Sequence, residues 1–257
     1  MIKAIFFDID GTLVSFRTHC IPQSAIKAIK AVRQQGVKVF IATGRPLPFV
    51  NNLGELEYDG IMTVNGADCQ TVEGTVIRHE PVDKADLIRL IDYTRQHPFP
   101  IAFASNDNTF ITSTSSETEE IMQLLDLKMP QTLPIEHCLQ MDVMQIIAFY
   151  KQHEHPELLE KVLSGCGAQR WHSYFADIIR QGNNKAQGID AMIEHYGISL
   201  DETMAFGDGG NDITMLQHVG LGVAMGNARE EVKMAAKYVT DDVDNDGIAV
   251  ALNKFVC

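Results

Sequence analysis

Residues 4–12 read AIFFDIDGT, and this sequence predicts how the first part of the chain folds. Its first four residues form a short apolar run, which predicts a buried strand that ends at Asp8. Asp8 and Asp10 follow the strand directly, with Gly11 and Thr12 behind them. Because ligands of open α/β sheets bind beyond the carboxyl ends of the strands, this pattern indicates a polar site at that edge.

Strands and helices alternate outward from this stretch and again at the other end of the chain. Apolar residues at helical spacing predict a helix that stops near Gly36, and a second helix is predicted over 185–196. We therefore predict an α/β fold whose core is a doubly wound, parallel, Rossmann-like sheet. The further predicted strands share short apolar runs and lie at 37–42, 61–64, 203–206, 221–224 and 238–240.

The middle of the chain has a different pattern. Residues 71–78, with Glu73-Gly74 at their centre, predict a β-hairpin. From residue 82 to 181, helices and neighbouring strands follow each other in an α+β order, which suits a second domain inserted into the first. We predict a core of residues 1–81 and 182–257 and an inserted α+β cap of residues 82–181.

The composition excludes several classes of protein. The 257 residues contain 21 Lys+Arg and 34 Asp+Glu, a net charge of −13, which disfavours binding to nucleic acid or to anionic membranes. No apolar run approaches the ~20 residues of a transmembrane helix, and the first apolar run is too short for a signal peptide. The five cysteines lack C-x-x-C spacing, which favours reduced thiols in a cytoplasmic protein. An acidic chain of this kind needs local positive charge if it is to handle phosphate.

Polar residues also occur at three further places on the same predicted edge. Residues 43–45 (TGR) follow the strand at 37–42, and residues 207–212 (GDGGND) follow the strand at 203–206. Lys185 opens the helix between them, at a position where a cation is unfavourable beside the helix dipole. The unfavourable position indicates a functional role for this lysine.

The electrostatics of this cluster predict a metal ion. Asp8, Asp10, Asp208 and Asp212 carry up to four negative charges, and each close pair costs ~4 kcal/mol at ~4 Å and an effective dielectric near 20. Mg²⁺ together with Lys185 would supply three positive charges, and Mg²⁺ favours a few carboxylates with a substrate phosphate. A carboxylate nucleophile beside a second acid, a metal and a lysine suits phosphoryl transfer through an aspartyl-phosphate.

Four motifs occur along the chain in the order 8–12 (DIDGT), 43–45 (TGR), Lys185 and 207–212 (GDGGND). Their sequences and order resemble those of the haloacid dehalogenase-like (HAD) hydrolases. Residues 64–67 (VNGA), 226–228 (GNA) and 246–249 (DGIA) extend the resemblance to the Cof-type subgroup of sugar-phosphate phosphatases. The resemblance implies a Mg²⁺-dependent phosphatase that acts on phosphomonoesters of small metabolites, and sugar phosphates are the first substrates to expect. It also implies that the inserted cap is a lid that excludes water and sets specificity.

The resemblance implies a role for each residue that handles the phosphoryl group. Asp8 would attack phosphorus, and Asp10 would protonate the leaving alcohol and then activate water. Thr43 and Gly44 would hydrogen-bond the phosphoryl oxygens, and Lys185 would neutralise them.

The remaining roles concern the metal and its surroundings. Mg²⁺ would be held by the Asp8 carboxylate, the Asp10 backbone carbonyl and Asp208. Asp212 would orient a metal-bound water or Lys185, and Asn211 would contact the phosphate or the metal shell. Thr12 is expected to support the site, and for Arg45 a nearby salt bridge and a substrate contact are equally open.

Three other functions fit part of this pattern. A phosphomutase would keep the phosphoryl group on the substrate, and a phospho-acceptor module of the receiver type would share the acidic pocket, the Thr and the Lys. A non-catalytic metabolite-binding protein is disfavoured because both Asp8 and Asp10 are present. The run Asp242-x-Asp244-x-Asp246-Gly247 mimics an EF-hand loop but has Asn253 at the twelfth position, so turn and helix-capping roles are predicted for it.

Overall fold

The computed structural model describes residues 1–124, 127–151 and 153–256, which form two compact units. The core unit comprises Met1–Arg45, Val50–His79 and Asn184–Cys257, and the inserted unit comprises Pro46–Phe49 and Glu80–Asn183. The boundaries expected from the sequence differ from these by two residues at each crossing. They also leave the 3₁₀ turn η1 (Leu47–Phe49) in the core, whereas the structure groups it with the inserted unit.

The core unit is built on an eight-stranded sheet with the order β14-β13-β12-β1-β2-β3-β4-β5. The strands from β14 to β3 are parallel, and β4 and β5 add two antiparallel strands at one edge. The predicted hairpin at 71–78 is therefore part of the core sheet, which is mixed and mostly parallel. The strands are β1 (Ala4–Phe7), β2 (Lys38–Ala42), β3 (Gly60–Thr63), β4 (Asp68–Thr71), β5 (Val76–His79), β12 (Thr203–Gly207), β13 (Leu221–Ala224) and β14 (Tyr238–Val239).

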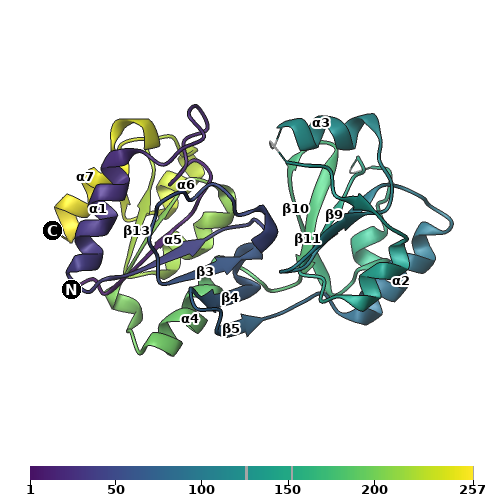
Figure 1. Ribbon diagram of the computed structural model, residues 1–257, viewed down its shortest axis with the longest axis horizontal. Coiled ribbons are helices and arrows are strands. Elements are labelled where there is room, and N and C mark those ends of the chain that lie inside the picture. The colour runs from purple at the N-terminus through teal and green to yellow at the C-terminus, as the bar shows by residue number, and fades with distance from the viewer. Residues whose placement is uncertain (125–126, 152, 257) are drawn as a thin grey trace. The chain divides into compact units, whose positions relative to one another are not determined.

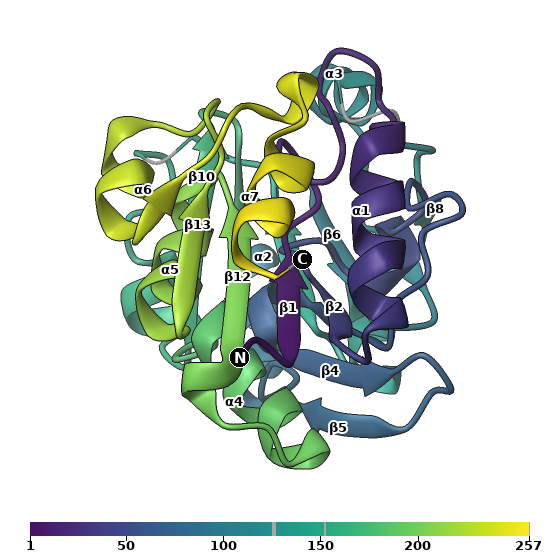
Figure 2. The ribbon, with the colours of Figure 1, turned by 90° about the vertical axis from the view of Figure 1, so that its left-hand side faces the viewer.

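Helices cover both faces of this sheet, which is why its central strands are mostly apolar. On one face, α1 (Gln23–Gln34) and α7 (Gly247–Phe255) pack against each other, as Figure 2 shows. On the other, α4 (Lys185–Tyr196), α5 (Ile213–His218) and α6 (Glu230–Ala235) contribute apolar side chains to one cluster with Phe6 and Phe40. All four residues of β1 are completely buried.

The order of the strands places the site. β1 pairs with β2 on one side and with β12 on the other, so the connections leave the sheet in opposite directions at this point. Such a switch point opens a crevice beyond the carboxyl ends of the strands. The segments that follow β1, β2 and β12 carry Asp8, Thr43 and Asp208.

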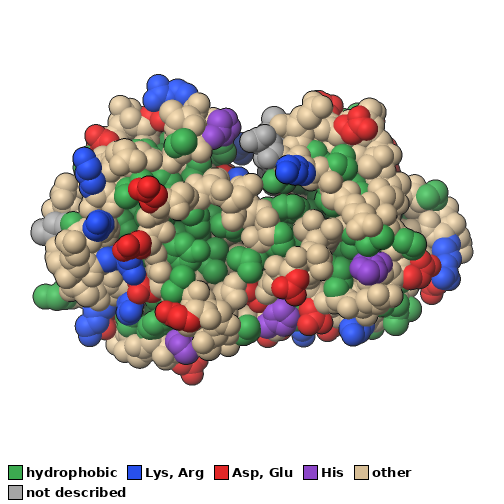
Figure 3. Space-filling view, viewed as in Figure 1, with side chains coloured by type: hydrophobic (Ala, Val, Ile, Leu, Met, Phe, Trp, Pro, Cys, Tyr) green, Lys and Arg blue, Asp and Glu red, His purple; other side chains and the backbone are tan. Residues whose placement is uncertain are grey.

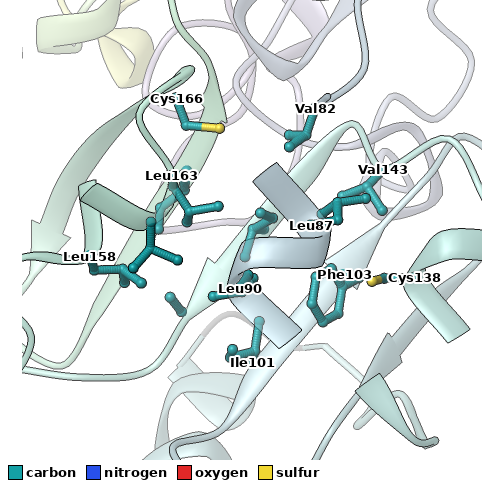
Figure 4. Close-up of a cluster of buried hydrophobic side chains, with 14 of the residues drawn as sticks. Val82, Leu87, Leu90, Ile101, Phe103, Cys138, Val143, Leu158, Leu163 and Cys166 are labelled. Carbon is teal, nitrogen blue, oxygen red and sulfur yellow. The ribbon is translucent and has the colours of Figure 1, made fainter. Parts of the chain in front are cut away.

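The inserted unit has its own sheet and its own core (Figures 1 and 4). Its six strands have the order β10-β11-β9-β6-β7-β8. Leu87 and Leu90 from α2 (Lys84–Thr94) pack with Phe103 of β6 in a cluster that is separate from the core unit. The other elements are β6 (Ile101–Ala104), β7 (Thr109–Ile111), α3 (Ser116–Leu124), β8 (Gln131–Thr132), the 3₁₀ helix η3 (Ile135–Gln140), β9 (Gln145–Ala148), the one-turn π-helix η4 (Leu158–Val162), β10 (Cys166–His172) and β11 (Phe175–Arg180).

Three features bear on the expectations from composition. In the described ranges, no helix is both long and apolar enough to cross a membrane. On the face drawn in Figure 3, Lys and Arg side chains are scattered among Asp and Glu. Four cysteines, Cys20, Cys69, Cys138 and Cys166, are free thiols, and Cys257 lies outside the described residues.

Candidate active site

Lys185 joins two carboxylates that come from distant parts of the chain. It is the first residue of α4, its side chain is completely buried, and its Nζ lies 2.6 Å from Asp8 Oδ1 and 2.5 Å from Asp212 Oδ1. Asn184 caps the helix, since its side-chain oxygen accepts the N–H of Gln187 at 3.2 Å. The cation that is unfavourable at a helix start is therefore stabilised by two ion pairs.

Asp212 also shapes the loop after β12. Its Oδ2 accepts the backbone N–H groups of Asp208, at 3.0 Å, and Gly209, at 2.8 Å, while its Oδ1 faces Lys185. The carboxylate is completely buried, so these bonds replace its lost hydration. Asp212 thus fixes Lys185 and the backbone that presents Asp208.

Asp8, Asp208 and Asp212 form a group that could hold a metal ion. Each offers a carboxylate oxygen, and the three oxygens all lie within 4.8 Å of one another. Thr12 Oγ1 donates to Asp208 Oδ1 at 2.8 Å, and Asn227 Nδ2 donates to Asp208 Oδ2 at 3.3 Å. Oxygen ligands of this kind suit a hard divalent cation such as Mg²⁺.

Burial and neighbouring charges both shift the pKa values of these groups. Burial raises the pKa of Asp8 well above its usual value, and the neighbouring Asp212 raises it further, although Lys185 acts in the opposite direction. Burial likewise raises the pKa of Asp208 to about 7, although the hydrogen bond from Thr12 lowers it. Burial alone would lower the pKa of Lys185, but Asp212 and Asp8 raise it above its usual value. The residues therefore fit a bound divalent cation, which would offset the charge that Lys185 leaves unbalanced.

Asp10 is not a member of this group of three carboxylates, and its side chain forms an ion pair with Arg45. Arg45 Nε and Nη2 each lie 2.7 Å from one carboxylate oxygen of Asp10, and this two-bond geometry fixes the plane of the carboxylate. Of the two roles left open for Arg45, the structure shows the salt bridge. Arg45 also donates its backbone N–H to Thr43 Oγ1 at 3.1 Å. The segment after β2 is therefore fixed both by this internal hydrogen bond and by the ion pair with Asp10.

Asn65 and Asn211 meet beside Gly44. Asn211 Nδ2 donates to Asn65 Oδ1 at 2.9 Å, and a Cβ on Gly44 would stand 3.3 Å from each of these atoms. Asn65 and the preceding Val64 have positive φ angles of 54° and 48°, which a β-branched residue such as Val rarely adopts. Strain of this kind persists where the surrounding structure imposes it, and here it turns Asn65 toward the segment after β2.

Comparison with known proteins assigns the family. The family of haloacid dehalogenase-like hydrolases matches residues 5–252 of the chain. The chain belongs to this family. The four motifs therefore predicted the family correctly.

Individual HAD-like relatives match over nearly their whole length. YkrA of Bacillus subtilis, which is named as a phosphatase, is 34% identical over 98% of this chain and 97% of its own. The solved structure of BT4131, described as a HAD subclass IIB sugar phosphatase, is 42% identical with a TM-score of 0.87 over 98% of both chains. BT1666 from Bacteroides thetaiotaomicron, a phosphatase of the same superfamily, is 38% identical with a TM-score of 0.91 over 99% of this chain and 95% of its own.

Two residues of the HAD-like site received no role from the sequence. Asn65 and Asn227 lie in segments that carry the family resemblance, but only the structure shows their partners. Asn227 also donates to the backbone oxygen of Gly11 at 2.8 Å and thereby ties the loop after β1 to the carboxylate of Asp208. The available signal was an asparagine near the end of a predicted strand, since Asn65 directly follows the strand predicted at 61–64 and Asn227 lies three residues beyond the strand predicted at 221–224.

Proposed function

We propose that this HAD-like phosphatase hydrolyses phosphomonoesters of small metabolites, with sugar phosphates first, through an aspartyl-phosphate on Asp8 and with Mg²⁺ as cofactor. The observation that carries the proposal is the buried Lys185 between Asp8 and Asp212, with Asp208 beside them. The 42% identity to a protein described as a sugar phosphatase supports the substrate class.

The first half-reaction transfers the phosphoryl group to the protein. A carboxylate oxygen of Asp8 attacks phosphorus, the bond from phosphorus to the leaving oxygen breaks, and Asp10 donates a proton to that oxygen. Arg45 holds both oxygens of Asp10, so one of these two bonds opens before Asp10 reaches the leaving group. Lys185 stabilises the charge of Asp8 and of the phosphoryl oxygens.

The second half-reaction restores the enzyme. Asp10 takes a proton from a water molecule, the water oxygen attacks phosphorus, and the bond to Asp8 breaks with release of inorganic phosphate. Thr43 and Gly44 would donate hydrogen bonds to the phosphoryl oxygens throughout both steps. Asn211, held by Asn65, would assist them.

The proposed metal site uses Asp8, Asp208 and the backbone carbonyl of Asp10. When bound, Mg²⁺ supplies Lewis-acid stabilisation of the phosphoryl charge. Asp212 is the third member of the carboxylate group, but its three contacts with Lys185 and the loop favour an orienting role over direct ligation. We also propose that residues 82–181, which lie within the inserted unit, act as the cap that selects the leaving group.

The test is release of inorganic phosphate from p-nitrophenyl phosphate and from a panel of phosphorylated metabolites with Mg²⁺. Asp8→Asn should abolish turnover, and Asp10→Asn should slow it by about 10²–10⁴-fold, the usual contribution of acid–base catalysis. Asp190→Asn is the matched control, because Asp190 is half exposed on α4 and pairs with His218. Undiminished hydrolysis by Asp8→Asn, or full activity in excess chelator, contradicts the proposal. Transfer of phosphate within the substrate without release would indicate a mutase.

A further inference from the structure

Phe16 stands exposed beside the predicted metal site. The residue is 66% exposed, although exposing an apolar phenylalanine side chain to water is not favourable. A Cβ built on Gly11 would lie 2.2 Å from Asp208 Oδ2 and 2.8 Å from Phe16 Cε2, so the edge of the ring and the carboxylate are neighbours across Gly11. The ring therefore borders the place where the phosphoryl group would be bound.

The loop that carries Phe16 is held in a defined conformation. The side chain of Ser15 is completely buried, and its Oγ donates to Asp244 Oδ1 at 2.8 Å. The same oxygen accepts the backbone N–H groups of Arg17, at 3.1 Å, and Thr18, at 3.3 Å. Arg17 also pairs with Asp244 at 3.2 Å, although this exposed pair contributes little. A single exposed apolar residue is ordinary, but Phe16 is presented by a loop whose conformation is fixed by three hydrogen bonds of the buried Ser15.

Asp244 connects this loop to the site. It lies in the 3₁₀ turn η7 (Val243–Asn245), and the N–H of Val243 donates to Asn227 Oδ1 at 3.1 Å. Asn227 in turn donates to the Gly11 backbone and to Asp208. The Asp242-x-Asp244-x-Asp246 run, which mimics a calcium loop in sequence, thus stabilises the segment after β1 through Ser15 and Asn227.

We propose that Phe16 is a specificity-determining residue whose ring packs on the leaving group of the phosphomonoester, and that Asp244 is the positioning residue that fixes its loop. The inference rests on the proposed phosphatase function and refines its substrate class. An aromatic face packs well on the C–H face of a sugar ring or on a planar ring, and a short acyclic group offers it little area. Phe16 therefore favours phosphomonoesters whose leaving group contains a ring.

The first test compares wild type with Phe16→Ala on glucose 6-phosphate and phenyl phosphate, which carry a ring, and on glycerol 3-phosphate, which does not. For the two ring substrates, kcat/KM should fall about two- to tenfold, the usual value of one aromatic contact, mainly through KM. The value for glycerol 3-phosphate should stay within about twofold. Phe16→Tyr should keep the preference, and Met234→Ala, at a residue 79% exposed elsewhere on the core unit, should leave all three values unchanged.

The second test concerns Asp244. Asp244→Ala removes the acceptor of the Ser15 hydroxyl and should lower the preference for ring substrates in the same direction as Phe16→Ala. Asp244→Asn keeps an acceptor oxygen and should retain most of the preference. In the double variant, Asp244→Ala should add nothing to Phe16→Ala, because both act through one ring. Asp190→Ala is the control for loss of a surface carboxylate, and thermal unfolding checks each variant for folding.

The outcomes separate this inference from the function on which it rests. An active wild type whose substrate preference is the same in Phe16→Ala overturns the role of Phe16 alone. Additive effects in the double variant overturn the positioning role of Asp244. A wild type that releases phosphate from no substrate overturns the proposed function and this inference together.

Discussion

Replacing Lys185 by Met tests the electrostatic design of the site. The substitution keeps a side chain of similar length but removes the cation that lies 2.6 Å from Asp8 and 2.5 Å from Asp212. Because Lys185 and Asp212 are completely buried, the variant keeps two carboxylates in the interior without a counter-charge. Breaking a buried pair in this way typically lowers the free energy of unfolding by about 3–5 kcal/mol. That is a large share of the roughly 5–15 kcal/mol that stabilises an ordinary protein.

The loss should depend on pH. In wild type the pKa of Lys185 is raised, so its contribution is complete below its unfolded pKa and is constant between pH 5 and 8. In the variant, Asp8, whose pKa burial and Asp212 already raise, loses the cation that opposes this shift. The native state then binds more protons than the unfolded state, so stability falls as pH rises. The difference between wild type and Lys185→Met should therefore be largest at pH 8 and smaller at pH 5.

Urea unfolding in chelator, followed by circular dichroism at both pH values, measures this difference. Lys30→Met, at an exposed position of α1, is the matched control and should change little. Adding Asp212→Asn to Lys185→Met should recover part of the stability without recovering turnover, because it removes one of the two uncompensated charges. A Lys185→Met protein that matches wild type at pH 8, or a deficit that is the same at both pH values, would show that Lys185 is not the counter-charge of Asp8 and Asp212.

Three further predictions concern neighbouring contacts. Gly11→Ala puts a Cβ on a residue with an unfavourable φ of 84° and places that Cβ against Asp208 Oδ2, so the rise in melting temperature caused by Mg²⁺ should be lost. Gly36→Ala is the control, because its φ of 87° is similar but its Cβ would meet open space. It should lower the free energy of unfolding by only about 1–2 kcal/mol and keep the rise. Because the pKa of Asp208 is raised to about 7, the stability of the metal-free protein should fall as pH rises from 4 to 7. Below pH 7, protons should compete with Mg²⁺ for Asp208, so the melting-temperature shift on adding Mg²⁺ should be larger at pH 8 than at pH 5.5. An equal shift at the two pH values would exclude Asp208 as a ligand. Arg45→Lys keeps the charge but loses the two-bond fork on Asp10, so steady-state kcat should fall by about 10- to 100-fold; unchanged kcat would show that Asp10 needs no such orientation.

Much of the fold could be predicted because its core strands are short apolar runs with polar ends. β1, β13 and α4 have the bounds expected from the sequence. The pairing of the hairpin β4–β5 with β3 could not be predicted, since a hairpin's own sequence does not say which sheet it joins. The predicted turn before α7 is present, but Asp246 caps no backbone N–H with its side chain; its carboxylate accepts instead from Ser24, a contact 222 residues away in sequence.

The candidate site was predictable to the extent that it depends on strand ends. Parallel strands bring the residues that follow them to one edge, and this places Asp8, Thr43 and Asp208 on neighbouring elements. Side-chain contacts depend on rotamers and on the paths of loops, which the sequence pattern does not specify. The hydrogen bonds of Arg45 to Asp10 and of Asn211 to Asn65 could therefore be identified only from the structure. The roles assigned to these residues in catalysis stay predictions.

The site conflicts with the rules that stabilise the rest of the core, and the conflict is what a phosphatase requires. Elsewhere the central strands bury apolar side chains, but beyond the end of β1 the fold buries Asp8 beside Asp212 and Lys185. Burial raises the pKa of Asp8 and the pKa of Asp208, and the neighbouring carboxylates raise them further. A protein selected for stability alone would replace such a cluster by apolar residues. Its presence at the switch point of the sheet is best explained by a ligand that brings a cation and a phosphoryl group to the same place.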